Sequence, residues 1–153
     1  MRDNKYLQTR LQEVLDTKFA DKTLSNPVSI EFGRKAATRL GSIRKDGRIS
    51  RVILTGHFID EQVPENIIDA TIAHELCHYF QGFCSDHDKI ADHPHQGKLV
   101  DHELIKRGYG DDLIFQKKWL KEYWPEMTRG QKRRRVRRKY VTISSVINSI
   151  FGR

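Results

Sequence analysis

Two histidines and a glutamate stand at a spacing that suits metal-assisted hydrolysis. The segment His74-Glu75-Leu76-Cys77-His78 is an HExxH pattern. Residues four apart on a helix project side by side, so both imidazoles can reach one zinc ion at about 2.0 to 2.1 Å. Glu75 would then lie beside a zinc-activated water, take its proton as it attacks a carbonyl, and protonate the leaving amine. The pattern predicts a hydrolase with Glu75 as its general base.

A catalytic zinc usually has three protein ligands, so the sequence must supply one more. The downstream candidates are His87, Asp88, Asp92, His93, His95 and His102. His95 immediately precedes a predicted helix that would hold it in place, so we rank it first and His93 second. We expect the other two histidines of this group to lie on the surface. The expected cofactor is one Zn²⁺ held by His74, His78 and His95.

The HExxH residues should lie on a helix that runs from Glu65 to about Phe83. Apolar residues recur along it at three- and four-residue spacings, as they do on one face of an amphipathic helix. The apolar stripe includes Ile68, Ile72, Leu76 and Tyr79. Stepping 100° per residue places the two histidines on the face opposite this stripe. The helix should therefore bury one face and present its histidines on the other.

A helix and three strands are expected before this motif. The spacing of apolar residues predicts an amphipathic helix over residues 4–19, and alternation predicts a strand over 28–32. Residues 40–43 and 49–54 read as a hairpin, because Asp46-Gly47 supplies the positive φ angles of a tight turn. The contiguous apolar run Val52-Ile53-Leu54 predicts a strand that helices cover on both faces.

Two more helices are expected after the motif. One should run from Gln96 to Arg107 and stop at Gly108, a favoured C-terminal cap. The other should span about 113–123 and end before Pro125. The sequence thus predicts an α+β fold of a single domain over residues 1–128, followed by a basic tail over 129–153.

Composition is that of a soluble, single-domain protein. The chain has 153 residues, of which 37% are hydrophobic and 31% charged. It has no apolar stretch long enough to span a membrane and no apolar signal segment, so we expect a cytoplasmic location. Its two cysteines, Cys77 and Cys84, form neither a disulfide framework nor a CxxC zinc motif. We expect both to be reduced, with Cys77 as a small packing residue.

Positive charge is concentrated in the tail. The chain carries a net charge of +8, but nine Lys or Arg and no acid follow Met127, which leaves −1 for residues 1–128. Such a run can bind nucleic acid non-specifically by neutralising phosphates. The residues expected to do so are Arg133, Arg134, Arg135, Arg137, Arg138 and Lys139. Two other interpretations are a solvated end with no partner and, with the apolar residues 141–151, a segment for an anionic membrane surface.

Over roughly residues 5–125 the chain resembles the SprT-like zinc metalloproteases. The resemblance rests on the HExxH helix, on Pro94-His95-Gln96-Gly97-Lys98-Leu99, and on residues 30–34 and 40–41 before the motif. In that family a third histidine follows in a proline-histidine-glycine context, with a bulky apolar residue four positions later, which matches His95 and Leu99. The resemblance implies a zincin-like fold, peptide-bond hydrolysis, and an association with DNA and DNA-bound protein, which would place the chain at the nucleoid.

Two departures from the family pattern stand out. Gln96 occupies the position where glycine often follows the third histidine, and no cysteine follows Cys84. The zinc ribbon of some members is therefore not expected, and the arginine-rich tail stands in its place.

Two other functions remain open on sequence alone. One is a non-catalytic nucleic-acid-binding protein with a structural zinc, and the other is a regulatory HExxH protease that cuts one specific repressor.

Overall fold

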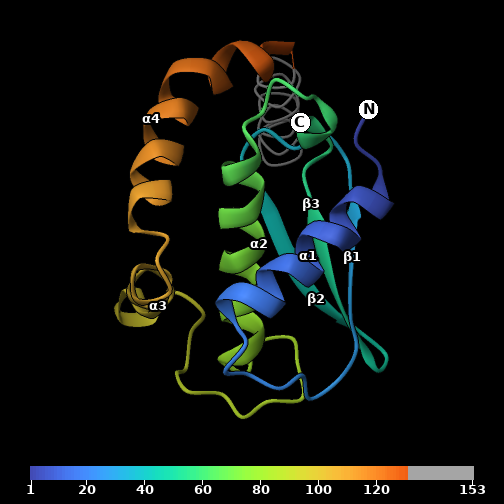
Figure 1. Ribbon diagram of the computed structural model, residues 1–153, viewed down its shortest axis with the longest axis vertical. Coiled ribbons are helices and arrows are strands. Elements are labelled where there is room, and N and C mark those ends of the chain that lie inside the picture. The colour runs from blue at the N-terminus through green and yellow to red at the C-terminus, as the bar shows by residue number, and fades with distance from the viewer. Residues whose placement is uncertain (131–153) are drawn as a thin grey trace, which may run out of the picture.

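The computed structural model describes residues 1–130 as a small mixed sheet with helices (Figure 1). The elements in chain order are α1 (Asn4–Lys18), β1 (Val28–Phe32), β2 (Gly41–Asp46), β3 (Ile49–Leu54), η1 (Gly56–Ile59), α2 (Glu65–Phe80), η2 (Gln96–Lys98), α3 (Leu99–Lys106) and α4 (Gly110–Met127). The predicted α+β class is confirmed, as are the helix over 4–19, the strand over 28–32 and the hairpin.

The sheet has the order β1-β3-β2, with the last strand of the chain in the middle. β1 pairs with β3 in parallel, and β2 pairs with β3 in antiparallel, so that Ile30 and Ile43 both lie opposite Val52. The hairpin turn contains Gly47 at φ +60°, the left-handed region that glycine adopts without strain. Because β2 pairs only with β3 within the described residues, it is an edge strand, and it begins at Gly41.

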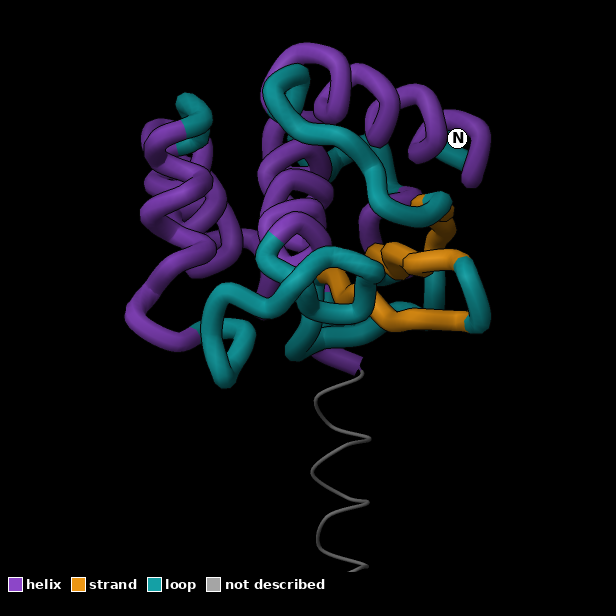
Figure 2. The backbone as a smooth tube through the Cα atoms, turned by 90° about the horizontal axis from the view of Figure 1, so that it is seen from below, coloured by secondary structure: helices purple, strands orange, loops and turns teal. Residues whose placement is uncertain are grey.

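The expectation that helices cover both faces of the sheet is wrong. Along β3, Ser50, Val52 and Leu54 are buried, whereas Arg51 and Ile53 are only half-buried. The strands contact α1 and α2, which lie on one side of the sheet in the view from below (Figure 2). Since side chains alternate across a strand, a contiguous apolar run does not require two covered faces. No helix within residues 1–130 packs along the other face, which we call the open face.

Helices α1 and α2 cover the inner face of the sheet. α1 buries Leu7, Leu11 and Val14, the stripe that its spacing predicts. Arg10 in α1 forms a two-pronged ion pair with Asp69 in α2, where its Nε donates to Oδ1 at 2.9 Å. This charge-assisted pairing joins the two helices.

Helix α2 is buried nearly all round, not on one face only as predicted. Ile68, Ile72 and Leu76 are fully buried in the core. Glu75 and His78, on the polar side, are buried as well, since only about 5% and 6% of their surface is exposed. The loop after α2, together with α3 and α4, covers the side that faces away from the sheet (Figure 1). The HExxH residues therefore lie in an enclosed setting.

Helix α2 ends at Phe80, three residues before the predicted end. Gly82 has φ +86°, its N–H donates to the Tyr79 carbonyl at 3.1 Å, and the Phe83 N–H donates to the His78 carbonyl at 2.9 Å. This is a Schellman arrangement, which satisfies the last carbonyls of a helix through a left-handed residue. The chain turns away just after the second histidine of the motif.

The predicted helix over 96–107 is divided in two. A short 3-10 turn, η2, precedes α3, and both Gly97 and Lys98 have positive φ angles, +61° and +55°. These conformations interrupt the α-helical hydrogen bonds. Gly108 ends α3 at φ +91°, as expected.

Helix α4 is longer than predicted, because it begins at Gly110 and continues past Pro125. Proline removes one backbone donor, but here it lies in the last turn, where little of the helix follows. Trp124 is buried and its Nε1–H donates to the Ala37 carbonyl at 2.8 Å. Thr128 closes the end by donating its hydroxyl to the Trp124 carbonyl at 2.8 Å.

The predicted functions of the tail fall on residues 131–153, which lie outside the described residues. Within residues 1–130, no helix has the length and apolar character needed to cross a membrane. Cys77 is a buried free cysteine, as predicted, and Cys84 is free and exposed.

Candidate metal centre

Three histidines meet at one point beside α2. His74 and His78 come from that helix, and His95 comes from the loop that ends at η2. Each has a ring nitrogen within 4.8 Å of those of the other two. The Nε2 atoms of His74 and His78 lie 3.1 Å apart, and the His95 ring centroid is 4.8 Å from that of His78. The three imidazoles predicted as ligands are therefore close enough to hold one metal ion.

Glu75 lies next to this cluster and points toward the edge strand. A Cβ atom added at Gly41, the first residue of β2, would lie 3.0 Å from Oε1 of Glu75. Both residues line a hollow of about 330 Å³, which His74 and Asp101 also border. The Glu75 carboxylate and the His74 imidazole thus border the same hollow, at the first residue of β2.

Burial sets the ionisation of the cluster. It lowers the pKa of His78 to about 4, with further lowering by the nearby His74 and His95. The pKa of His74 is also lowered by burial and by His95, although Asp101 opposes this. At neutral pH both imidazoles are therefore uncharged, which is the form that binds metal ions.

Burial also raises the pKa of the Glu75 carboxyl to about 7, and the positive charge of Arg39 lowers it in part. A carboxyl whose pKa lies near neutrality can both accept and release a proton at that pH. Glu75 is thus suited to move protons in either direction.

Buried hydrogen bonds tie the loop after α2 to the sheet. Asn26 donates to Ser50 Oγ at 2.9 Å and accepts from the Asp86 N–H at 3.1 Å, while Ser50 donates to the Cys84 carbonyl at 2.6 Å. Lys45 on β2 also forms an ion pair with Asp86. These contacts anchor the start of the segment that brings His95 back to the helix.

Gln96 closes the other end of that loop. Its Oε1 accepts from the backbone N–H of Asp92 at 3.0 Å and of His93 at 3.4 Å. Its own N–H donates to the His93 carbonyl at 3.2 Å. A glycine could not make the side-chain contacts, so the residue that departs from the SprT-like pattern stabilises the turn that carries His95.

The remaining downstream histidines lie outside the cluster. His93 and His102 are exposed, and neither belongs to the group of converging ligand atoms. His87 is half-buried, not on the surface as expected, because its ring packs against Tyr79 and Phe80 at centroid distances of 5.1 and 5.4 Å. The ranking of His95 over His93 agrees with this geometry.

Three residues beside the cluster were not singled out from the sequence. Arg39 acts on the charge of Glu75, Gly41 makes room for that carboxylate, and Asp101 acts on the charge of His74. Leu40 and Gly41 belonged to a predicted strand and to the SprT-like resemblance, but neither was given a role beside the metal, and Arg39 carried no signal. No local pattern indicates that the start of this strand meets the third turn of a helix thirty residues later.

Gly41 offers a test of this close approach. We expect Gly41→Val to lower the free energy of unfolding by about 1 to 3 kcal/mol, the usual range for overpacking. The added side chain would meet Thr71 at 2.9 Å and Leu54 at 3.1 Å, as well as Glu75. Urea unfolding would measure the change. The matched control is Gly110→Ala, where an added Cβ has no neighbour within 4 Å; an equal loss in both would contradict the close packing at Gly41.

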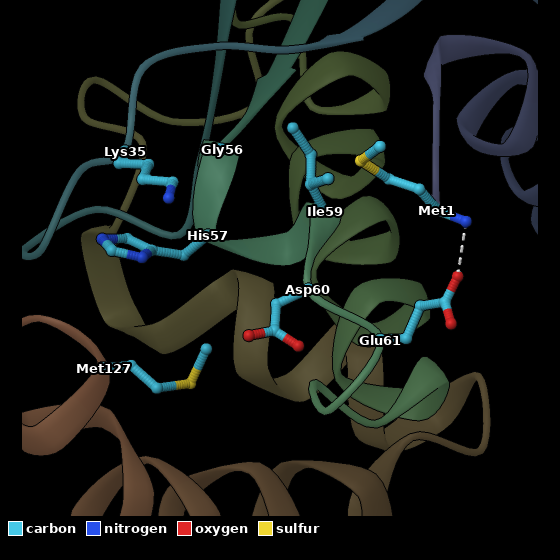
Figure 3. Close-up of a pocket in the computed structure, with 8 residues that line it drawn as sticks. All are labelled: Met1, Lys35, Gly56, His57, Ile59, Asp60, Glu61 and Met127. Atoms are coloured by element: carbon cyan, nitrogen blue, oxygen red, sulfur yellow. Dashed lines mark ion pairs between the residues drawn. The ribbon is translucent and has the colours of Figure 1, made fainter.

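A hollow larger than the one beside Glu75 lies elsewhere, near the N-terminus (Figure 3). It measures about 710 Å³ and includes Lys35, His57 and Met127 in its lining, while the Met1 amine pairs with Glu61 at 2.7 Å. His57 is buried edge-on against the Trp124 ring, with centroids 5.2 Å apart. None of the three clustered histidines borders this hollow, so size alone does not identify the candidate centre.

Comparison with known proteins adds no assignment: no family model, no curated protein and no solved structure matches this chain. The interpretation of the centre therefore depends on its own residues and geometry.

Proposed function

We propose that this protein is a zinc-dependent peptidase of SprT-like, zincin-like type. The observation that carries the proposal is the convergence of His74, His78 and His95 within 4.8 Å, with the Glu75 carboxylate beside them. Three imidazoles and one adjacent, non-ligating carboxylate are the parts that zinc hydrolases use.

The donor set fits zinc on two grounds. Two nitrogens bound tetrahedrally at about 2.0 to 2.1 Å lie roughly 3.3 Å apart, and the two Nε2 atoms of His74 and His78 are separated by 3.1 Å. Three imidazoles also leave a fourth position of the tetrahedron for water or substrate, as catalytic zinc sites do. A bound zinc ion would supply Lewis acidity, which acidifies water and polarises a carbonyl.

Glu75 would carry the proton transfers. Its carboxylate accepts a proton from the attacking water and then donates it to the nitrogen of the broken peptide bond. The enclosed position of Glu75, about 5% exposed, keeps bulk water from competing for this proton. The positive charge of Arg39 limits the rise of its pKa, so an ionised fraction remains available at neutral pH.

The edge strand β2 would hold the substrate. Within the described residues it pairs only with β3, so its other edge presents free backbone N–H and C=O groups. An extended peptide can add to such an edge through main-chain hydrogen bonds. Because Gly41 at the start of β2 faces Glu75, a peptide on this edge would pass the carboxylate. We therefore propose an extended or unfolded polypeptide as the substrate.

The basic tail supports a further part of the proposal, namely that the substrates are DNA-associated proteins. Residues 129–153 carry nine Lys or Arg and no acid. Arg133, Arg134, Arg135, Arg137, Arg138 and Lys139 would bind nucleic acid through its phosphates. Such binding would place the peptidase on nucleic acid in the cytoplasm or nucleoid, next to proteins bound there.

The test is metal analysis together with cleavage of an unfolded protein. The purified full chain should bind one zinc ion and cut denatured casein, and a chelator should abolish cutting until zinc is restored. A structural zinc would leave the substrate intact at every zinc concentration, and a repressor-specific protease would leave casein intact in the presence and absence of DNA. The absence of stoichiometric zinc would overturn the proposal.

A further inference from the structure

Positive and negative side chains are unevenly distributed over residues 1–128, although their sum is close to zero. Residues 33–51, which hold β2, the segment before it and the first half of β3, contain seven Lys or Arg and one acid, Asp46. The rest of residues 1–128 contains twelve basic and nineteen acidic residues. The hairpin side is therefore a basic region on an otherwise acidic domain, separate from the basic tail.

Most of these cations form no ion pair within residues 1–130. Arg51 pairs with Glu31 at 3.6 Å and with Asp46 at 3.3 Å, which uses the one acid of the segment. Lys45 pairs with Asp86. The others are Arg34, Lys35, Arg39, Arg44 and Arg48, all exposed, and no acid within residues 1–130 lies at ion-pair distance from any of them.

Three of the unpaired arginines border one hollow. Arg34, Arg39 and Arg44 line a space of about 560 Å³, which also contacts Ser42 and Ile53. In the β2–β3 register, Ser42 lies opposite Ile53 and Arg44 opposite Arg51, so these side chains share the open face of the sheet. The three arginines thus border a hollow on the face that no described helix covers. Glu31 also borders it, and its charge is offset by its ion pair with Arg51.

We propose that this arginine hollow, formed by Arg34, Arg39 and Arg44, binds the phosphate backbone of nucleic acid. Guanidinium groups bind phosphate oxygens through paired N–H donors, and unpaired ones lose no internal salt bridge on binding. β2 spans about 20 Å, long enough to follow several successive phosphates of one strand.

A polyanion fits this surface better than an acidic peptide. One acidic side chain would need one arginine, whereas five exposed, unpaired cations lie along this part of the chain. Repeated phosphates would engage several of them together. Because Gly41 borders both this hollow and the one beside Glu75, nucleic acid here would lie next to the proposed peptidase centre.

The test compares two triple variants of the full chain with equal net charge. The first replaces Arg34, Arg39 and Arg44 by Gln. The control replaces Lys117, Lys118 and Lys121 by Gln. These three lysines are exposed on α4 and lie outside the hollow. Binding of a short labelled DNA duplex is measured by fluorescence anisotropy between about 50 and 200 mM salt.

The triple arginine variant loses three phosphate contacts, so its negative slope of log affinity against log salt should become shallower by about 2 to 3. The lysine control should retain most of the parent slope. Equal slopes for the two variants would overturn the proposal, since the effect would then be one of net charge. Unchanged thermal unfolding and zinc content in both variants would establish that the fold is intact.

Two competitors identify the ligand. Poly-glutamate at the same charge concentration should displace little DNA; equal displacement would mean that the hollow takes acidic polypeptide, and the proposal would be wrong. Inorganic phosphate should compete no better than chloride at equal ionic strength, and stronger competition would indicate a pocket for free phosphate instead. Because binding is measured without hydrolysis, its result is independent of whether the chain proves to be a peptidase.

Discussion

Glu75→Gln is expected to lower kcat/KM for peptide hydrolysis by about 10²- to 10⁴-fold, the usual contribution of a positioned general acid or base. This corresponds to roughly 3 to 5 kcal/mol of lost transition-state stabilisation. Gln has nearly the same shape and would fit beside Gly41, but it cannot accept the proton of the attacking water. Because Glu75 is not one of the three converging ligands, the zinc content should remain at the parent level.

The matched control is Glu122→Gln on the exposed side of α4, which should keep full activity. Stability gives a second readout in the zinc-free chain. Burial raises the folded pKa of Glu75 from 4.5 to about 7, so its charge destabilises the folded state increasingly as pH rises through this range. Glu75→Gln should therefore unfold at a higher temperature than the parent near pH 7, and no higher below pH 4.5. Full hydrolysis by this variant would rule out the assigned role.

The sequence predicted the parts of the centre that depend on local spacing. The positions of His74 and His78 follow from the 3.6-residue period of a helix, and the turn at Asp46-Gly47 follows from the φ angles that glycine allows. The identity of His95 as the converging third histidine required only that a regular element follow it, although that element is a 3-10 turn and not the start of one long helix.

Long-range contacts explain what the sequence did not show. The polar side of α2 carries His78 and Glu75, and periodicity therefore placed it in solvent. In the structure the start of β2, the later loop and the later helices bury it. Hydrogen bonds such as Asn26–Asp86 and Gln116–Thr71 hold these elements in place, and their partners lie far apart in the chain. Periodicity reports which side chains avoid water, but not which polar ones other elements will cover.

The net charge of residues 1–128 did not reveal the basic hairpin. A net charge of −1 over residues 1–128 indicated a neutral domain with a basic tail, because the sum cancels a basic hairpin against the acidic remainder of the domain. Only the fold shows that Arg44 and Arg34 face one hollow, while Arg51 is neutralised by its neighbours. The asymmetry appears when charge is summed over the segments that share one face of the fold.

His95→Ala is expected to weaken zinc binding by at least about 100-fold, since changes even to outer-shell partners of a metal site reach 10- to 100-fold. After dialysis at low free zinc, the parent chain should retain one zinc ion and the variant almost none. His95 is exposed and lies outside the hydrophobic core, so its removal should leave the metal-free fold unchanged. Circular dichroism and urea unfolding of the metal-free chains would check this.

The matched control is His93→Ala, two residues earlier in the same loop. His93 is equally exposed, but it contributes no atom to the converging group; its contacts are the backbone N–H to Gln96 Oε1 and the carbonyl to the Gln96 N–H, both of which alanine keeps. Zinc content should therefore stay near one ion per chain. Full zinc in His95→Ala with loss in His93→Ala would mean that the loop shifts by two residues when metal binds. His93 would then replace His95 as the third ligand beside His74 and His78. The turn that Gln96 closes would have to open to bring His93 to the metal.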